Sequence, residues 1–187
     1  MQEPIPGAAE AGITSQFGPL GRWLLQVSKL LAIAGGLVFV VLVAMSIVSI
    51  VGRKLWSLPV PGDIEVLQMA AAFASASFFA YCHLNGGDVK VDFFTAKASP
   101  LVVHALDALG SLLVGAFGSL IAWRAAVGAL AVKAAGEASM ILDWPLWIAQ
   151  MLMVPGFVLM GMAGFYMAGV YWRARSAPTV EFNGVQP

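Results

Sequence analysis

Four long stretches of the 187-residue chain contain no charged residue, and they limit its possible folds more than any other feature. They cover residues 30–52, 66–87, 108–123 and 144–172, with lengths of 23, 22, 16 and 29 residues. A helix needs about 20 mostly apolar residues to cross a hydrocarbon core about 30 Å thick. The third stretch is shorter, but Asp107 and Arg124 at its two ends can extend toward the membrane surfaces. The pattern therefore predicts four transmembrane spans.

The composition supports a membrane protein and excludes several other classes. Hydrophobic residues make up 60% of the chain and charged residues 11%, whereas soluble domains have about 25% charged residues. Ten Lys and Arg balance ten Asp and Glu, so the chain has no basic field that would attract nucleic acid. Cys82 is the single cysteine, which excludes an internal disulfide and a cysteine-built metal site.

The spans are expected to be helices, because backbone groups in lipid must form their hydrogen bonds within the protein. The alternation of polar and apolar residues that is typical of membrane β-strands does not occur. We expect an all-α membrane protein with one four-helix domain at residues 23–175 and tails at residues 1–22 and 176–187. The predicted spans are approximately residues 28–52, 64–84, 101–124 and 145–172.

An even number of spans places both termini on the same side of the membrane. Six Lys and Arg flank the spans on that side and four on the other, so the positive-inside rule predicts cytoplasmic termini. In the loop between the second and third spans, Val91, Phe94 and Ala98 have the spacing of a short helix lying in the membrane interface.

Charged residues at the ends of the spans on the side opposite the termini form a candidate rim for contact with a partner protein. Arg53 and Lys54 end the first span, where cations oppose the helix dipole. Asp63 is a natural N-cap for the second span, and Glu65 lies in its first turn, within reach of an ion pair with Arg53. Lys133 completes the rim. Membrane anchoring and helix capping explain the same residues without any partner.

The titratable residues do not form a catalytic, substrate-binding or metal site that we can recognise, so we expect no enzyme activity and no cofactor. No charged residue lies near the middle of a span, so the chain is not expected to conduct a solute alone. His83 and His104 flank the second loop on the same side. Two such histidines are the minimum for a b-type haem, which leaves a membrane anchor of a respiratory oxidoreductase as the alternative.

Small residues are concentrated in the later spans, where they allow helices to approach closely. They serve either a tight intramolecular bundle or a partner in the membrane. The candidate helix-packing positions are Ala70, Ala74, Gly110, Gly115, Gly118, Gly161 and Gly164.

The order of these motifs resembles the small membrane subunit, of the DctQ type, of tripartite ATP-independent periplasmic (TRAP) transporters. The resemblance covers about residues 28–172 and rests on Arg53 at the end of the first span, on Pro61-Gly62-Asp63-Ile64-Glu65, and on the loop motif from Gly87 to Phe94. Two positions depart from the family: Lys54, where many members have an aromatic residue, and Asp88, where histidine is frequent. The candidate family-motif residues of the loop are Gly87, Asp88, Lys90 and Asp92.

The resemblance implies a subunit in the bacterial inner membrane that does not itself transport solute. In the family, a large transmembrane subunit transports the substrate with a sodium gradient, and a periplasmic solute-binding protein delivers it. The small subunit supports the large one and helps to dock the binding protein. The implied partners of this chain are therefore both of these proteins and the surrounding membrane lipids, with sodium bound on the large subunit. The implied solutes are organic acids, such as C4-dicarboxylates or sugar acids.

Overall fold

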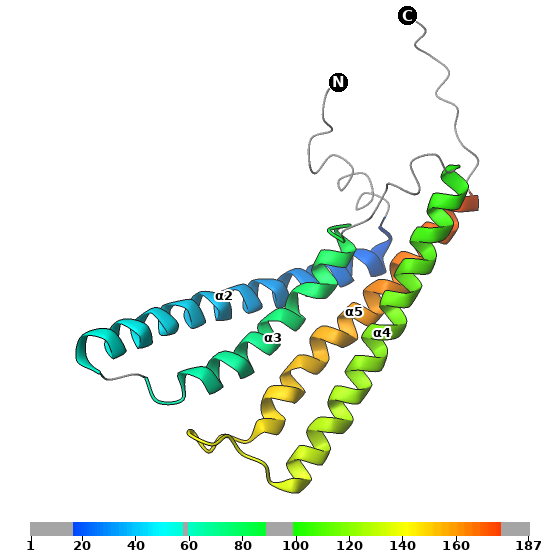
Figure 1. Cartoon of the computed structure of the whole chain (residues 1–187). Helices are drawn as coiled ribbons and strands as arrows, with labels where there is room; N and C mark the ends of the chain where they lie inside the picture. Colours follow the sequence, from blue (N-terminus) through cyan, green and yellow to red (C-terminus); the bar gives the residue numbers. More distant parts are fainter. Residues whose placement is uncertain (1–16, 58–59, 89–98, 177–187) are drawn as a thin grey trace, which may run out of the picture.

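The computed structural model describes residues 17–57, 60–88 and 99–176. These residues form four long helices, namely α2 (Pro19–Trp56), α3 (Asp63–Leu84), α4 (Pro100–Ala135) and α5 (Leu146–Ser176) (Figure 1). Each helix is long and apolar enough to cross a membrane. The predicted all-α architecture with four membrane-spanning helices is confirmed. The interfacial helix predicted between the second and third spans falls on residues 89–98, outside the described residues.

Two of the helices extend well beyond the predicted spans. The 38 residues of α2 measure about 57 Å along the helix axis, and the 36 residues of α4 about 54 Å. The start of α2 overlaps the predicted N-terminal tail, because the helix begins at Pro19. Just before it, Phe17 is buried against the ring of Tyr166, with the ring centroids 5.5 Å apart. The Gly18 N–H also donates to the Tyr166 hydroxyl at 3.2 Å, so this segment is fastened to α5.

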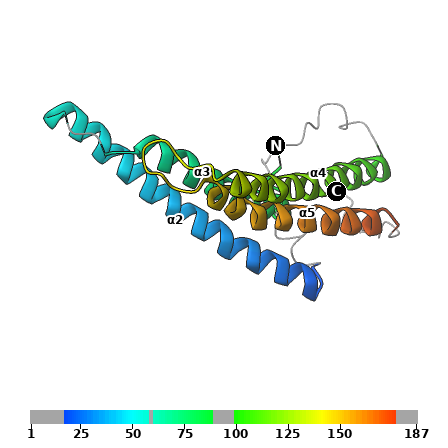
Figure 2. The same cartoon turned by 90° about the horizontal axis from the view of Figure 1, so that it is seen from below.

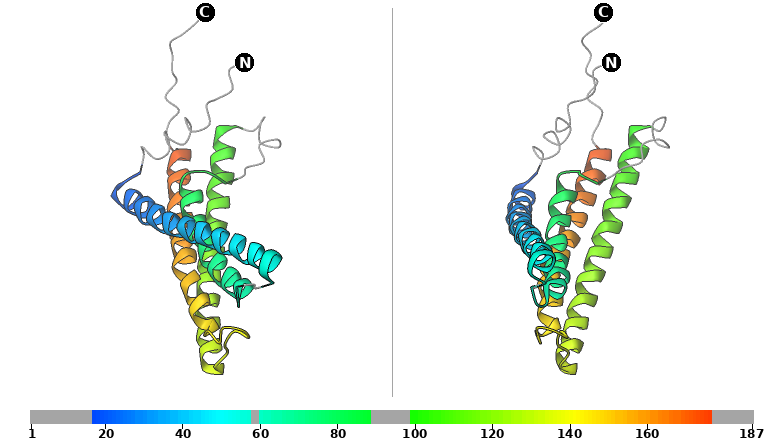
Figure 3. Two further views of the ribbon diagram at one scale, coloured as in Figure 1. Left: turned by 90° about the vertical axis from the view of Figure 1, so that its left-hand side faces the viewer. Right: turned by 60° about the vertical axis from the view of Figure 1, so that its left-hand side comes forward.

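The helices pack in the order α2, α3, α5, α4. The most extensive contact is between α4 and α5, while α3 packs on both α5 and α2. Figures 2 and 3 show that α2 crosses the other helices obliquely, whereas α4 and α5 run side by side. The result is a tight pair, α4 and α5, with α3 on one side of it and α2 outermost.

One narrow stripe attaches α2 to the rest of the bundle. Gly21, Ser28, Gly35, Leu42 and Ser49 are all buried and recur at every seventh residue. A seven-residue repeat keeps one line of a helix facing its neighbour. Large apolar side chains cover the remaining faces of α2 and are exposed, including Leu30, Leu37, Val40, Val43, Ile47 and Ile50.

The main apolar core lies where the start of α2, the end of α3, the start of α4 and the end of α5 meet. Leu24, Leu84 and Met167 are its largest fully buried side chains. A second, smaller cluster of Ala76, Ala122 and Phe157 lies farther along the bundle. Toward the end where the α2–α3 and α4–α5 connections lie, α2 diverges from α4 and α5 (Figure 1). Polar contacts become important at that end.

Candidate functional site

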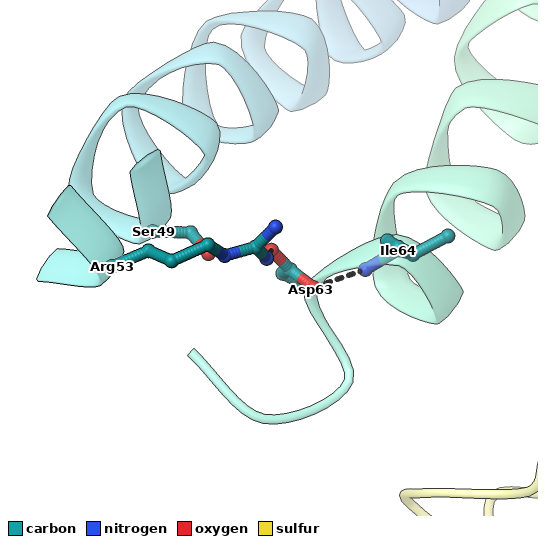
Figure 4. Close-up of polar contacts among 4 residues, drawn as sticks. All are labelled: Ser49, Arg53, Asp63 and Ile64. Atoms are coloured by element: carbon teal, nitrogen blue, oxygen red, sulfur yellow. Dashed lines mark hydrogen bonds and ion pairs between the residues drawn. The ribbon is translucent and has the colours of Figure 1, made fainter. Parts of the chain in front are cut away.

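A cluster of polar residues joins α2 to α3 at the open end of the bundle (Figure 4). The Arg53 guanidinium approaches an Asp63 carboxylate oxygen at 3.3 Å, and the buried Ser49 hydroxyl donates to the same oxygen. The other Asp63 oxygen accepts a hydrogen bond from the Ile64 N–H at 2.8 Å. Ser49 and Arg53 lie four residues apart and therefore share one face of α2. Asp63 thus connects the end of α2 to the start of α3.

Glu65 has a different partner from the one expected. Its two carboxylate oxygens accept hydrogen bonds from the Ile141 and Leu142 N–H groups, at 2.9 and 3.1 Å. The predicted ion pair between Arg53 and Glu65 is therefore wrong, because Arg53 pairs with Asp63 and Glu65 binds the α4–α5 connection.

The residue that caps α3 also differs from the prediction. Gly62, with φ of 72°, is the N-cap, and Asp63 is the first helical residue. Leu142 lies against Gly62, so that a Cβ added there would be only 2.5 Å from Leu142 Cγ. The tight left-handed turn and this close contact explain why a glycine precedes Asp63.

The two lysines of the candidate rim lie on different helices. Lys54 is exposed in the last turn of α2. The Lys133 ammonium, near the end of α4, lies 4.6 Å from the centre of the Trp147 ring on α5. This cation–π contact adds to the contact between α4 and α5, although Lys133 itself is exposed, as are Arg53 and Lys54.

The opposite end of the bundle holds the histidines and the first residues of the loop motif. His83 Nδ1 pairs with the Asp88 carboxylate, while its Nε2 atom is buried without a hydrogen-bond partner. The Nδ1 atom of His104 is also buried and unpartnered. Gly87 lies against Cys82, and a Cβ there would be 3.0 Å from Sγ. Lys90 and Asp92 lie outside the described residues.

Glycines allow the backbones of α4 and α5 to approach closely. A Cβ added at Gly164 would lie 2.4 Å from the Gly115 nitrogen, and one at Gly118 would lie 2.8 Å from the Gly161 nitrogen. Distances this short leave no room for any side chain atom. Close approach of this kind is how helices associate in lipid. These four candidate packing glycines therefore lie on one seam within the chain.

The other candidate packing residues have different surroundings. Ala74 is fully buried against α2, where Gly35 approaches its carbonyl oxygen. Ala70 is half-buried and lines an apolar groove between α3 and α5. Gly110 faces open space, with no atom within 4 Å of an added Cβ.

Two features of this region are not among those that the sequence predicts. Ser49 could have been recognised as a second partner of the Asp63 carboxylate, because it lies four residues before Arg53 on the same helical face. The binding of Glu65 to the connection between α4 and α5 involves backbone N–H groups, and these have no sequence signal. Within the described residues, no group of three or more His, Cys, Asp or Glu side chains could hold a metal ion.

A comparison with known protein families agrees with this arrangement of four membrane helices. Residues 42–174 match the family described as tripartite ATP-independent periplasmic transporters, DctQ component. No curated protein and no solved structure matches the chain. The matched segment covers the C-terminal part of α2 from residue 42 onward and all of α3 and α4, and it ends within α5. The chain therefore belongs to the DctQ family, the small permease component of TRAP transporters, and is a multi-pass protein of the inner membrane.

Proposed function

We propose that this chain is a non-catalytic scaffold in a sodium-driven TRAP transporter that takes up an organic acid. It supports the large transmembrane subunit and contributes a periplasmic surface to which the solute-binding protein docks. The solute is a C4-dicarboxylate or a sugar acid. The family match supports the transporter over the respiratory anchor, since the family is a transporter component rather than an enzyme family.

The observation that best supports the scaffold role is the distribution of polar groups along the helices. The middle of each span is free of charged residues, and long apolar faces of α2 and α4 are exposed in the isolated chain. Sites for ions or solutes within a membrane normally require polar or charged groups. Exposed apolar faces can instead contact lipid or another membrane subunit. The polar clusters lie at the helix ends, where a water-soluble partner can reach them.

Co-expression with a large membrane subunit and a solute-binding protein tests this proposal. We expect a stoichiometric, colourless complex whose uptake of a labelled organic acid in proteoliposomes requires both the binding protein and a sodium gradient. A single monodisperse chain without a membrane partner would contradict the scaffold role. A haem absorbance band in the purified protein would support the respiratory anchor.

The docking role of the rim has a separate test. The double variant Arg53→Gln, Glu65→Gln removes two charges and is expected to reduce uptake while the complex still assembles. A control, Arg22→Gln, removes one charge near the start of α2, at the other end of the bundle. Unchanged uptake in the first variant, or an equal loss in the control, would contradict a specific docking role for the rim.

A further inference from the structure

The connection between α4 and α5, residues 137–145, forms a small hairpin at the same end of the bundle as Arg53. The Ser139 N–H donates to the Trp144 carbonyl at 2.8 Å, and the Leu146 N–H donates to the Glu137 carbonyl at 3.2 Å. The Trp144 N–H donates in turn to the buried Ser139 hydroxyl at 3.2 Å. In Figure 1 this hairpin extends beneath the start of α3. The hydrogen bonds within the hairpin therefore define the shape of the hairpin.

Contacts with α3 hold the tip of this hairpin in place. The Glu65 carboxylate binds the N–H groups of Ile141 and Leu142, and the Leu142 side chain lies against Gly62. The tip is therefore held by Glu65 on α3 and by contact with Gly62, the residue just before α3. A partner that binds this tip does not have to order it first, which favours affinity.

The tip presents two adjacent apolar side chains to solvent. Met140 is 99% exposed and Ile141 is 63% exposed, although neighbouring Ser139 is buried. Neither side chain belongs to the apolar clusters of the bundle. Two adjacent apolar side chains on a fixed backbone have the form of an anchor that inserts into a pocket of a partner.

The charges around the tip favour a protein over a lipid surface. Glu137 and Asp143 flank it and are exposed, and no Lys or Arg occurs from residue 134 to residue 172. Segments that bind membranes from the interface usually combine their apolar residues with Lys or Arg, which attract anionic lipids. Trp144, near the end of the hairpin, and Trp147, in the first turn of α5, are residues typical of the membrane interface. The acidic tip precedes them in the chain and is expected to lie on the water side.

We propose that Met140 and Ile141 form an apolar pin that inserts into the docked solute-binding protein. The matching surface on that protein is an apolar notch bordered by Lys or Arg, which complement Glu137 and Asp143. This inference rests on the proposed function and on the predicted periplasmic position of this end of the bundle. It adds to the proposed docking role of the charged rim a second contact, on a segment outside the rim.

Photo-crosslinking of the complete transporter identifies what contacts the pin. A photoreactive p-benzoylphenylalanine replaces Met140 in one preparation and, as a control, Leu20 in another. Leu20 is 58% exposed and lies at the start of α2, at the end of the bundle opposite the rim. We expect a cross-link to the solute-binding protein from position 140 and none from position 20. A cross-link to the large subunit or to lipid, or no cross-link, would overturn the inference.

A binding measurement tests whether the contact matters. The double variant Met140→Ser, Ile141→Ser should weaken the affinity of the binding protein for the complex about tenfold, as loss of central interface residues does. The control Leu20→Ser, Leu101→Ser removes two exposed apolar side chains at the other end of the bundle and should leave the affinity unchanged. Wild-type affinity in the first variant would refute the pin. If the wild-type complex transports solute but the pin variant binds normally, the proposed function stands and only this inference fails. If the wild-type complex does not bind the solute-binding protein, both are refuted.

Discussion

Replacing Gly164 by alanine should force α4 and α5 apart. The new Cβ would lie 2.4 Å from the Gly115 nitrogen, 2.6 Å from its Cα and 2.8 Å from the Ser111 carbonyl oxygen. Ordinary contacts of a Cβ begin at 3.4 Å, so the backbones of α4 and α5 must separate by roughly 1 Å. A gap of that size loses about a quarter to a half of the local dispersion energy. Overpacking typically costs about 1–3 kcal/mol. Alanine regains about 1 kcal/mol through its higher helix propensity. The expected net loss is therefore about 0–2 kcal/mol relative to the wild type, and about 1–3 kcal/mol relative to a Gly→Ala change at an open helical position.

Denaturation by sodium dodecyl sulfate in mixed micelles measures this loss as a change in the free energy of unfolding. Gly169→Ala is the matched control, because it lies on the same helix with no atom within 4 Å of the added Cβ. The control should be as stable as the wild type, or more so. If Gly164→Ala were as stable as Gly169→Ala, the close packing of α4 on α5 would not be the source of stability that we infer.

Two further variants test the contacts at the rim. Gly62→Ala should destabilise the chain by about 1–2 kcal/mol, because the φ angle of Gly62 is 72° and the new Cβ would overlap Leu142. Denaturation in mixed micelles measures this loss, and a free energy of unfolding equal to that of the wild type would contradict the tight turn. Asp63→Asn should lower the melting temperature more than Arg53→Gln does, since it weakens the contacts of Asp63 with both Arg53 and Ser49. A thermal-shift assay compares the two, and equal melting temperatures would refute the central role of Asp63.

The four helices could be predicted from the sequence because lipid leaves a charge-free apolar segment few alternatives to a helix. The helix ends were harder to predict. Beyond Arg124, α4 continues to Ala135, since residues 125–135 are mostly good helix formers and no Pro interrupts them. It ends where Gly136 adopts a φ of 68°. Charged residues therefore indicate where a span can leave the membrane. The helix itself continues until a residue such as Gly136, in the left-handed conformation, ends its hydrogen-bond pattern.

The partners of Asp63 and Glu65 illustrate what the pattern of charges did not predict. Both residues were expected on one rim, with Arg53 near Glu65. Two residues along an α-helix differ by about 200° around its axis, so Asp63 and Glu65 point to nearly opposite sides of α3. Asp63 consequently meets α2, and Glu65 meets the hairpin. The helical period could have separated them, but the hairpin that Glu65 binds has no sequence signal.

Arg53 and Glu65 both fix the arrangement of the helix ends and belong to the proposed docking surface. A variant of either residue therefore affects both properties at once. Helices in lipid lack a hydrophobic force between them, so directed contacts at their ends have a large influence on how they are arranged. Arg53 and Glu65 make such contacts, and changing them alters the arrangement of α2 and the hairpin as well as the surface charge. Met140 is almost completely exposed and belongs to neither apolar cluster. A loss of uptake in a Met140 variant would therefore report on docking more directly than the same loss in an Arg53 or Glu65 variant.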